Sequence, residues 1–234
     1  KKNNIKPFLA IVGFIVMVIG LFQRDLGSAI VFFVTSLGML YVSEAPLKYF
    51  LSLLPLSLIG GILFTLTSGY RKQRVLAFLD PFADPQGFSY HISQVLIALG
   101  SGGIFGLGLG QSRQKYNFIP EVTTDSIFSI VGEELGFVGG IVVIGLLSYF
   151  IYKMMRIATR APDAYSTVLA TGIVAWMCAQ IFLNIASMVA LTPLTGIPLP
   201  FFSYGGSSLV MVLTACGILL NISSYETKKI ASRR

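Results

Sequence analysis

The sequence has 234 residues, of which 54% are hydrophobic and only 12% are charged, and its net charge is +7 at pH 7. Soluble domains contain about 25% charged residues, so this composition excludes a water-soluble domain built around a single core. The chain is instead expected to bury most of its apolar surface in a lipid bilayer. Cys178 and Cys216 lie within apolar runs, so neither a disulfide framework nor a metal-binding pair is indicated.

Apolar segments of helical length recur along the chain and predict an all-α polytopic membrane protein with six transmembrane helices. Residues 164–225 carry no formal charge and are too long for one helix. Pro193, Pro198 and Pro200 interrupt this stretch, so it provides the fifth and the sixth span. The other spans are residues 7–22, 27–43, 49–70, and a segment that begins near residue 125 and is uncharged over 135–152.

Lysine and arginine are unevenly distributed among the segments that connect these spans. With the N-terminus in the cytoplasm, six spans return the C-terminus to the same side, and eleven of the 17 basic residues are then cytoplasmic. The charge bias therefore predicts that both termini of this chain are cytoplasmic. Five of the other basic residues gather in residues 71–124, between the third and fourth spans.

Residues 71–124 are too long for a simple connector and are expected to form a large extracellular loop. The loop begins with a basic, amphipathic run and becomes apolar and rich in glycine over residues 92–110. This second part is predicted to be a re-entrant or interfacial helix that ends in loops. Irregular backbone is tolerated at membrane depth only where protein or water satisfies it, so we expect the loop to pack into a cavity among the helices.

The five basic residues of this loop indicate an anion site at the membrane surface. A pyrophosphate on a lipid carrier would suit them, because arginine can bind phosphate oxygens in a bidentate manner. The same side chains could instead contact lipid head groups or pair with acidic residues of the loop, and the sequence leaves both interpretations open. The acidic residues are Asp80, Asp84 and Glu121.

Acidic residues at the ends of spans are the candidates for chemistry. Asp125 could act as a general base or a cation ligand at the outer surface, or it could be the N-cap of the fourth span. Glu133 and Glu134 lie one to two turns further along and could face a polar cavity or pair with structural donors. Asp25 follows Arg24 in the first outer turn, where an ion pair and helix capping explain it equally well.

The last outer loop, residues 195–208, is uncharged and rich in proline, glycine and hydroxyl groups. Such a segment can line a polar groove, or it can be a turn that allows close helix packing through small residues. The chain contains no GxSxG, P-loop, HExxH or cysteine-cluster motif, so hydrolase, NTPase and zinc-enzyme interpretations have no support. The single histidine, His91, has no cluster of ligand-type residues around it in the sequence.

Five segments in this order resemble the motifs of the SEDS family, whose members are FtsW, RodA and the sporulation protein SpoVE. The version of the glycine-rich motif here is more similar to the division branch, FtsW, than to the elongation branch. Three positions depart from the family pattern: Thr123 stands where the family often has His, Ser126 where it often has Phe, and His91 where it often has Gln. The five segments are residues 23–29, 80–94, 100–115, 120–136 and 198–208.

The resemblance implies a peptidoglycan glycosyltransferase that polymerises lipid II. A full-length member has ten spans, so residues 1–234 would form a single membrane domain that lacks about four N-terminal spans. Asp125 would be the catalytic residue and, with a divalent cation such as Mg²⁺ or Mn²⁺, a metal ligand. The residues expected to bind substrate are Arg71, Arg74, Lys115, Glu121, Thr124, Ser203 and Ser207, and those expected to support the site are Asp25, Asp80, Asp84, Glu133 and Glu134.

The resemblance also implies where the protein works and with what. It places the chain in the bacterial inner membrane, with lipid II and undecaprenyl-linked glycan as substrates. A class B penicillin-binding protein, which is a transpeptidase, and other divisome or elongasome proteins are the expected partners, and no nucleic acid is expected. Two other functions stay open: a transporter that flips lipid II, and a non-catalytic scaffold that recruits a transpeptidase.

Overall fold

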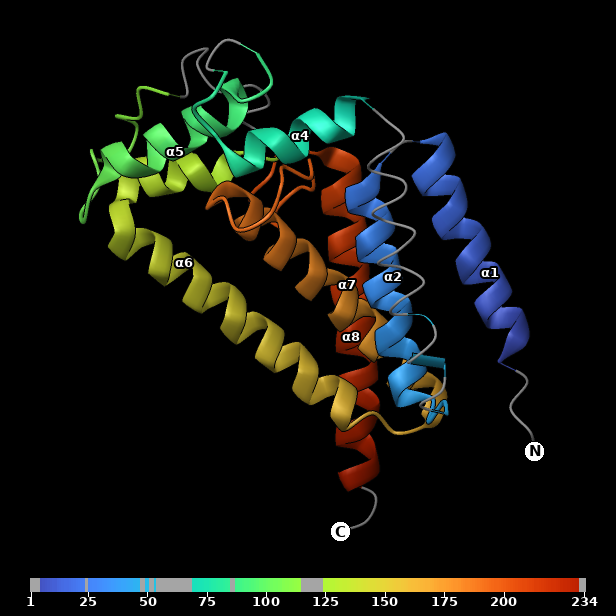
Figure 1. Ribbon diagram of the computed structural model, residues 1–234. Coiled ribbons are helices and arrows are strands. Elements are labelled where there is room, and N and C mark those ends of the chain that lie inside the picture. The colour runs from blue at the N-terminus through green and yellow to red at the C-terminus, as the bar shows by residue number, and fades with distance from the viewer. Residues whose placement is uncertain are drawn as a thin grey trace. The chain divides into compact units, whose positions relative to one another are not determined.

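The regular elements of the protein are all helical over the residues that the computed structural model describes, which confirms the all-α prediction for them (Figure 1). The described residues are 5–23, 25–46, 49–50, 53, 69–84, 87–114 and 124–231, without the side chains of residues 21, 70, 71 and 226–231. The elements are α1 (Lys6–Met17), the π-helical turn η1 (Val18–Phe22), α2 (Leu26–Val42), α4 (Gly69–Leu79), α5 (Tyr90–Gly102), α6 (Ile127–Thr159), α7 (Ala164–Met188) and α8 (Gly206–Ala231).

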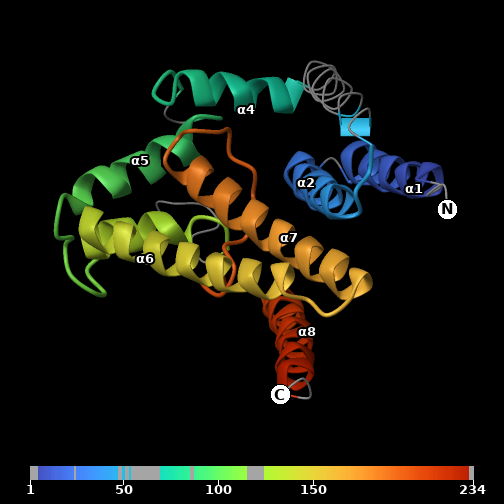
Figure 2. The same ribbon diagram turned by 90° about the horizontal axis from the view of Figure 1, so that it is seen from below.

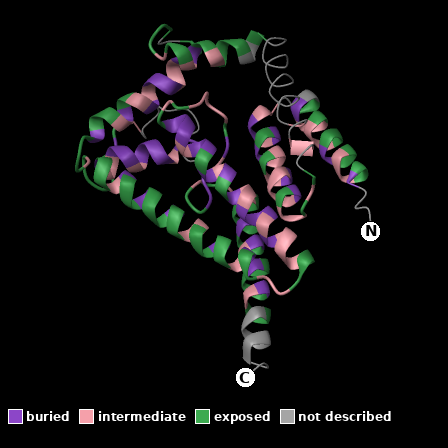
Figure 3. Cartoon of the chain, turned by 60° about the horizontal axis from the view of Figure 1, so that its bottom comes forward, coloured by how far each residue is buried: buried purple, intermediate pink, exposed green. Residues whose placement is uncertain are grey.

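Three of the described helices are long and apolar enough to cross a membrane, namely α6, α7 and residues 206–225 of α8. The most apolar part of α6 has a mean hydropathy of 2.1, yet only 17% of it is buried. Figure 3 shows this exposure along α6. Apolar surface on this scale is stable in lipid and not in water, so the protein is a multi-pass membrane protein. The helices α1 and α2 are apolar but shorter, and the third predicted span, 49–70, lies almost wholly outside the described residues.

Contacts within the chain divide it into two compact units. Unit 1 comprises Lys1–Phe50, Tyr149–Gln180 and Ser207–Arg234, and unit 2 comprises Leu51–Ser148 and Ile181–Gly206. The helices α6 and α7 each contribute residues to both units.

The core of unit 1 is built from apolar stripes at helical spacing. In α7 the buried residues recur three and four positions apart, which places them on one face of the helix. Close packing also requires a small residue on α2, since a Cβ at Gly38 would lie 2.9 Å from the Cβ of Ala175. The core residues are Met154, Ala158, Ala170, Ile173, Val174, Met177, Val212, Ala215, Leu219 and Ile222.

Asp25 begins α2 as its N-cap. Its carboxylate accepts hydrogen bonds from the backbone N–H of Ser28, at 3.0 Å, and from the Ser28 hydroxyl, at 2.5 Å. This pairing satisfies a backbone donor that the first turn of the helix leaves without a partner. Arg24, the expected ion-pair partner, lies outside the described residues.

In unit 2, the glycine-rich segment after α5 inserts into a break in α6. The break is at Gly136, whose backbone angles (φ 68°, ψ −167°) are not helical. Two of the backbone hydrogen bonds of the helix are replaced there by hydrogen bonds to the inserted segment, residues 103–108. The N–H groups of Leu107 and Gly108 donate to the carbonyls of Glu133 and Glu134, both at 3.0 Å. The N–H groups of Phe137 and Val138 donate to the carbonyls of Gly103 and Ile104, at 2.9 and 3.1 Å.

The insertion explains why glycine is needed at this point of the chain. A Cβ at Gly136 would lie 2.6 Å from the carbonyl oxygen of Ile104, and a Cβ at Gly106 would lie 2.7 Å from the N–H nitrogen of Gly136. Both residues also have positive φ angles, which side chains disfavour. The irregular backbone at this point is therefore satisfied by protein. It also fixes the position of the segment that follows, residues 109–114.

Candidate active site

Asp125 lies in a turn before α6, with 9% of its surface exposed. Helix α6 begins at Ile127, so Ser126 rather than Asp125 occupies the position before its first residue. The Oδ1 atom of Asp125 accepts hydrogen bonds from the hydroxyls of Ser126, at 3.3 Å, and of Thr124, at 3.5 Å. No backbone N–H donates to this carboxylate among the described residues, so the capping alternative has no hydrogen bond behind it there.

The backbone around Asp125 is fixed by a buried asparagine at the end of α7. Asn184 is 1% exposed, and its Nδ2 donates to the carbonyl oxygens of Asp125 and Ile197, both at 2.7 Å. One amide group thus ties the turn before α6 to the segment that follows α7. On the other side, a Cβ at Gly196 would lie 3.8 Å from Oδ2 of Asp125, so the backbone of this segment comes close to the carboxylate.

His91 joins the start of α5 to the same turn. Its Nε2 lies 2.7 Å from the hydroxyl oxygen of Ser126, which is fully buried and also bonded to Asp125. A chain of hydrogen bonds therefore runs from His91 through Ser126 to the carboxylate. These contacts connect two of the three positions at which the sequence departs from the family pattern.

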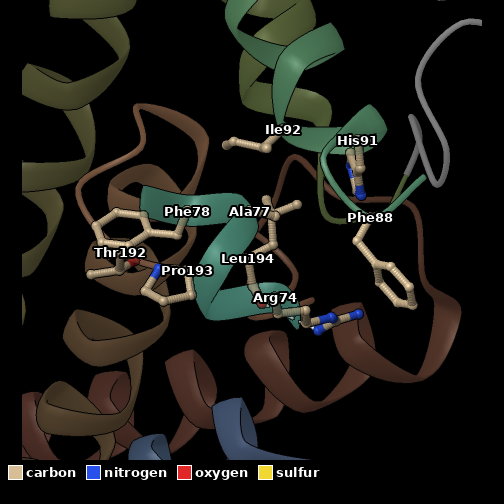
Figure 4. Close-up of a pocket in the computed structure, with 9 residues that line it drawn as sticks. All are labelled: Arg74, Ala77, Phe78, Phe88, His91, Ile92, Thr192, Pro193 and Leu194. Atoms are coloured by element: carbon tan, nitrogen blue, oxygen red, sulfur yellow. Dashed lines mark hydrogen bonds between the residues drawn. The ribbon is translucent and has the colours of Figure 1, made fainter. Parts of the chain in front are cut away.

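A pocket of about 140 Å³ opens beside His91 (Figure 4). Arg74 reaches it from α4, and its Nη1 donates to the carbonyl oxygen of Leu194 at 3.2 Å while the side chain remains exposed. The segment after α7, which lies beside α5 in Figures 1 and 2, contributes the rest of the polar lining. The pocket thus combines a largely apolar lining with the guanidinium of Arg74 and the ring of His91. Its lining residues are Arg74, Ala77, Phe78, Phe88, His91, Ile92, Thr192, Pro193 and Leu194.

Glu133 is 1% exposed and holds the segment after the insertion. Its carboxylate accepts hydrogen bonds from the hydroxyl of Ser112, from the backbone N–H of Arg113 at 3.1 Å and from that of Gln114 at 3.4 Å. The neighbouring Glu134 accepts a bond from the backbone N–H of Ser112 at 3.4 Å. The pairing with structural donors that the sequence left open thus accounts for the burial of Glu133.

The other candidate residues are placed as follows. The hydroxyl of Ser203 accepts a bond from the backbone N–H of Leu199 at 2.7 Å and closes a turn. Asp80 and Asp84 are exposed at the end of α4 and after it, where Asp80 accepts a bond from the N–H of Phe82 at 3.3 Å. Asp25 and the exposed Ser207 belong to unit 1. The side chain of Arg71, and Lys115 and Glu121 entirely, lie outside the described residues.

The structure therefore brings together Asp125, Thr124 and, through Ser126 and His91, the pocket with Arg74. A divalent cation at Asp125 would find one carboxylate there. Over the part of the chain that the structure describes, no three side chains of His, Cys, Asp or Glu are grouped to hold a metal ion. The described residues do not form a cation site by themselves, so the cation stays a prediction and no step below depends on it.

Comparison with known proteins decides the family. The sequence profile of FtsW, RodA and SpoVE, described as cell cycle proteins, matches residues 1–228. The chain belongs to the FtsW/RodA/SpoVE family. Among curated members of this family, the chain is 44% identical to "Stage V sporulation protein E" of Bacillus subtilis (strain 168), over 96% of this chain and 61% of that protein.

Two other proteins extend the comparison. The chain is 38% identical to "Probable peptidoglycan glycosyltransferase FtsW" of Geobacter sp. (strain M18), over 93% of this chain and 59% of that protein. It also resembles a chain in a solved peptidoglycan synthase complex that coordinates polymerization and crosslinking, with 26% identity and a TM-score of 0.71 over 93% of this chain and 62% of that one. This chain thus spans about three fifths of the length of the family members it matches, at 61% and 59% for the curated ones.

Sequence reasoning missed His91, Ser126 and Asn184 as parts of this site. A single histidine without ligand-type neighbours in the sequence gives no sign of a functional role. A single asparagine in an apolar helix cannot be distinguished by sequence from other isolated polar residues. One signal was present for the other two: both His91 and Ser126 depart from the family pattern. When two residues in separate motifs both differ from the family pattern, contact between their side chains can explain it, and the side chains of His91 and Ser126 do form a hydrogen bond.

Proposed function

We propose that the protein is a peptidoglycan glycosyltransferase that polymerises lipid II into β-1,4-linked glycan strands. One observation carries the proposal: the Asp125 carboxylate is buried, is held by two hydroxyl groups, and is connected through Ser126 and His91 to a pocket that Arg74 lines. A base and an anion-binding pocket in one unit suit the transfer of a sugar from a pyrophosphate carrier. The name of the Geobacter relative agrees with this chemistry.

In the reaction, Asp125 accepts the proton of the 4-hydroxyl of the acceptor's N-acetylglucosamine. The hydroxyl oxygen then bonds to the anomeric carbon of the donor strand, with inversion at that carbon. The bond from this carbon to the pyrophosphate oxygen breaks, and the electron pair leaves with undecaprenyl pyrophosphate. Thr124 and Ser126 hold the carboxylate in place through their hydroxyls.

The leaving pyrophosphate requires positive charge. Arg74 lines the pocket, and Arg71 and Lys115 come from the same outer loop in the sequence. Guanidinium groups stabilise the charge that develops on the leaving oxygen more than the charge of the ground state, which is how they accelerate the reaction. The remaining residues predicted to bind substrate, Glu121, Ser203 and Ser207, have no assigned step.

Transport and scaffolding explain the site less well. A lipid II flippase should carry ionisable groups near the middle of the membrane, and Glu133 and Glu134 are the candidates. The Glu133 carboxylate already accepts bonds from a hydroxyl and two backbone N–H groups, and that of Glu134 accepts one from a backbone N–H, which suits a fixed structural role. A scaffold that only recruits a transpeptidase would not require a buried carboxylate beside a cationic pocket.

The activity itself can be measured with the purified, complete gene product in detergent or liposomes. It should convert lipid II into glycan strands that are visible by gel electrophoresis. A triple variant in which Arg71, Arg74 and Lys115 are each replaced by Gln should polymerise lipid II about tenfold more slowly or worse, because the leaving group loses its positive partners. Translocation of lipid II across liposomes without strand formation would favour the flippase, and neither activity would favour the scaffold.

The orientation proposed is that of an outer active site with both termini of this chain in the cytoplasm of a bacterial cell. Near the end of α6, Lys153 lies 5.1 Å from the ring centre of Tyr149, and Arg156 lies 6.0 Å from that of Tyr152. Aromatic residues with basic neighbours are typical of the cytoplasmic interface. Asp125 precedes the other end of the same helix. A class B penicillin-binding protein is the proposed partner on the outer side, in line with the crosslinking in the similar solved complex.

Labelling of single cysteines tests this orientation. In a background with Cys178→Ala and Cys216→Ala, a membrane-impermeant thiol reagent should label Ala83→Cys in intact spheroplasts. It should label Ala164→Cys, beyond the basic end of α6, only after the membrane is opened. Both positions are exposed in the structure, so access to the reagent depends on the side of the membrane. The reverse pattern would invert the proposed topology and place Asp125 in the cytoplasm.

A further inference from the structure

The contact between His91 and Ser126 connects two motifs that are far apart in the sequence. Ser126 is fully buried and Asp125 is 9% exposed, so bulk water cannot replace a lost bond at either position without rearrangement. Ser126 is one of only two described groups that donate to the Asp125 carboxylate. Its distance of 3.3 Å is shorter than the 3.5 Å of Thr124.

The direction of each bond follows from the number of protons. An ionised carboxylate can only accept, so the single hydroxyl proton of Ser126 points to Oδ1 of Asp125. The 2.7 Å contact fits either direction; with the Ser126 proton on Asp125, the oxygen of Ser126 accepts from His91 and Nε2 of His91 carries a proton. Both the Nε2-protonated neutral ring and the charged ring meet this condition, and the Nδ1-protonated neutral ring does not.

The groups around His91 are consistent with a donor role. Arg74 approaches from α4 and shares the pocket with His91, and the Thr192–Leu194 segment contributes no ionisable group. Ser126 connects His91 to the Asp125 carboxylate. His91 is therefore positioned to fix the hydroxyl of Ser126, and through it the carboxylate.

We propose that His91 and Ser126 form a positioning pair that orients the Asp125 carboxylate toward the acceptor hydroxyl. The proposal rests on the proposed function of Asp125 as the base. The pair touches the carboxylate on Oδ1, which leaves Oδ2 for the proton of the acceptor. Without the pair, the carboxylate loses the nearer of its two donors and can rotate away from the productive geometry, which lowers the rate of the chemical step.

Kinetics of variants of the complete gene product test the pair. Ser126 lines no part of the pocket, so Ser126→Ala should lower kcat for glycan polymerisation about tenfold and leave KM for lipid II unchanged. His91→Leu should lower kcat to the same extent, and the double variant should lose no more, because both side chains act through one bond. His91→Gln should restore most of kcat, since its side-chain amide can still donate to Ser126.

A matched control separates positioning from stability. Ser129 is also fully buried in α6, but its hydroxyl donates to a backbone carbonyl at 2.7 Å and does not contact Asp125. Ser129→Ala should therefore keep kcat within about twofold of the wild type. If Ser126→Ala and His91→Leu also retain kcat while the wild type polymerises lipid II, the positioning pair is wrong and the proposed function stands.

A readout that needs no activity decides the bonds themselves. Nitrogen NMR of protein labelled in histidine reports which ring nitrogen carries the proton, and the His91→Gln variant identifies the signal of His91. The proposal requires a protonated Nε2 whose signal moves in Ser126→Ala and in Asp125→Ala, although Asp125 does not contact the ring. A ring protonated only at Nδ1, or a signal that is unchanged in Asp125→Ala, would overturn the pair even if the wild type made no glycan and the proposed function failed.

Discussion

Asp125→Asn is expected to abolish glycan polymerisation while the protein remains folded. The asparagine side chain has almost the same shape, and its Oδ1 can still accept the bonds from Thr124 and Ser126. The backbone bond from Asn184 does not involve the replaced group. The amide has almost no basicity, however, and loss of a general base costs roughly 100-fold to 10,000-fold in rate.

The comparison with Asp125→Ala separates catalysis from a structural role. Alanine removes both the base and the acceptor of two hydroxyl bonds, so this variant should be inactive and should also melt at a lower temperature. The measurements are strand formation from purified lipid II and thermal unfolding in detergent, both with the complete gene product. Strand formation near the wild-type rate by Asp125→Asn would remove Asp125 as the base, and with it the proposed mechanism.

Much of the helical framework could be predicted because its signals are local. The uncharged stretch 135–152 lies within α6, and the three prolines at 193, 198 and 200 follow the end of α7, as expected. The insertion of residues 103–108 into α6 could not be predicted. The sequence around Gly136 is a continuous helical pattern, and the break depends on four bonds to a segment that lies more than twenty residues earlier in the chain.

In the candidate site, too, some residues are indicated by local sequence signals and others are not. Asp125 stands out by its position at the start of a span, and Arg74 by its charge in an outer loop. His91 contributes through a bond to a residue 35 positions away, which no local pattern records. The sequence indicates that Glu133 is costly to bury, but its partners include the hydroxyl of Ser112 and the backbone N–H groups of residues 113 and 114. The sequence cannot indicate which backbone groups lack other bonds.

Gly136→Ala is expected to destabilise the protein strongly, through the insertion. The φ angle of 68° with ψ of −167° is open essentially to glycine alone, which costs other residues about 1–3 kcal/mol. The new Cβ would also lie 2.6 Å from the carbonyl oxygen of Ile104, so the inserted segment would have to move and its four bonds would weaken. We expect a total loss of about 3 kcal/mol or more and a melting temperature lower by roughly 5–10 °C.

Gly145→Ala, in the same helix, is the matched control for this prediction. No atom lies within 4 Å of a Cβ at Gly145 apart from its own helix, so alanine fits there without displacement. Because alanine favours the helix by roughly 0.5–1 kcal/mol over glycine, this variant should melt at or slightly above the wild-type temperature. Thermal unfolding of both variants in the same detergent measures the difference. If Gly136→Ala had the same melting temperature as Gly145→Ala, the break in α6 would not hold the glycine-rich segment. The fixed position of residues 109–114 would then have no support.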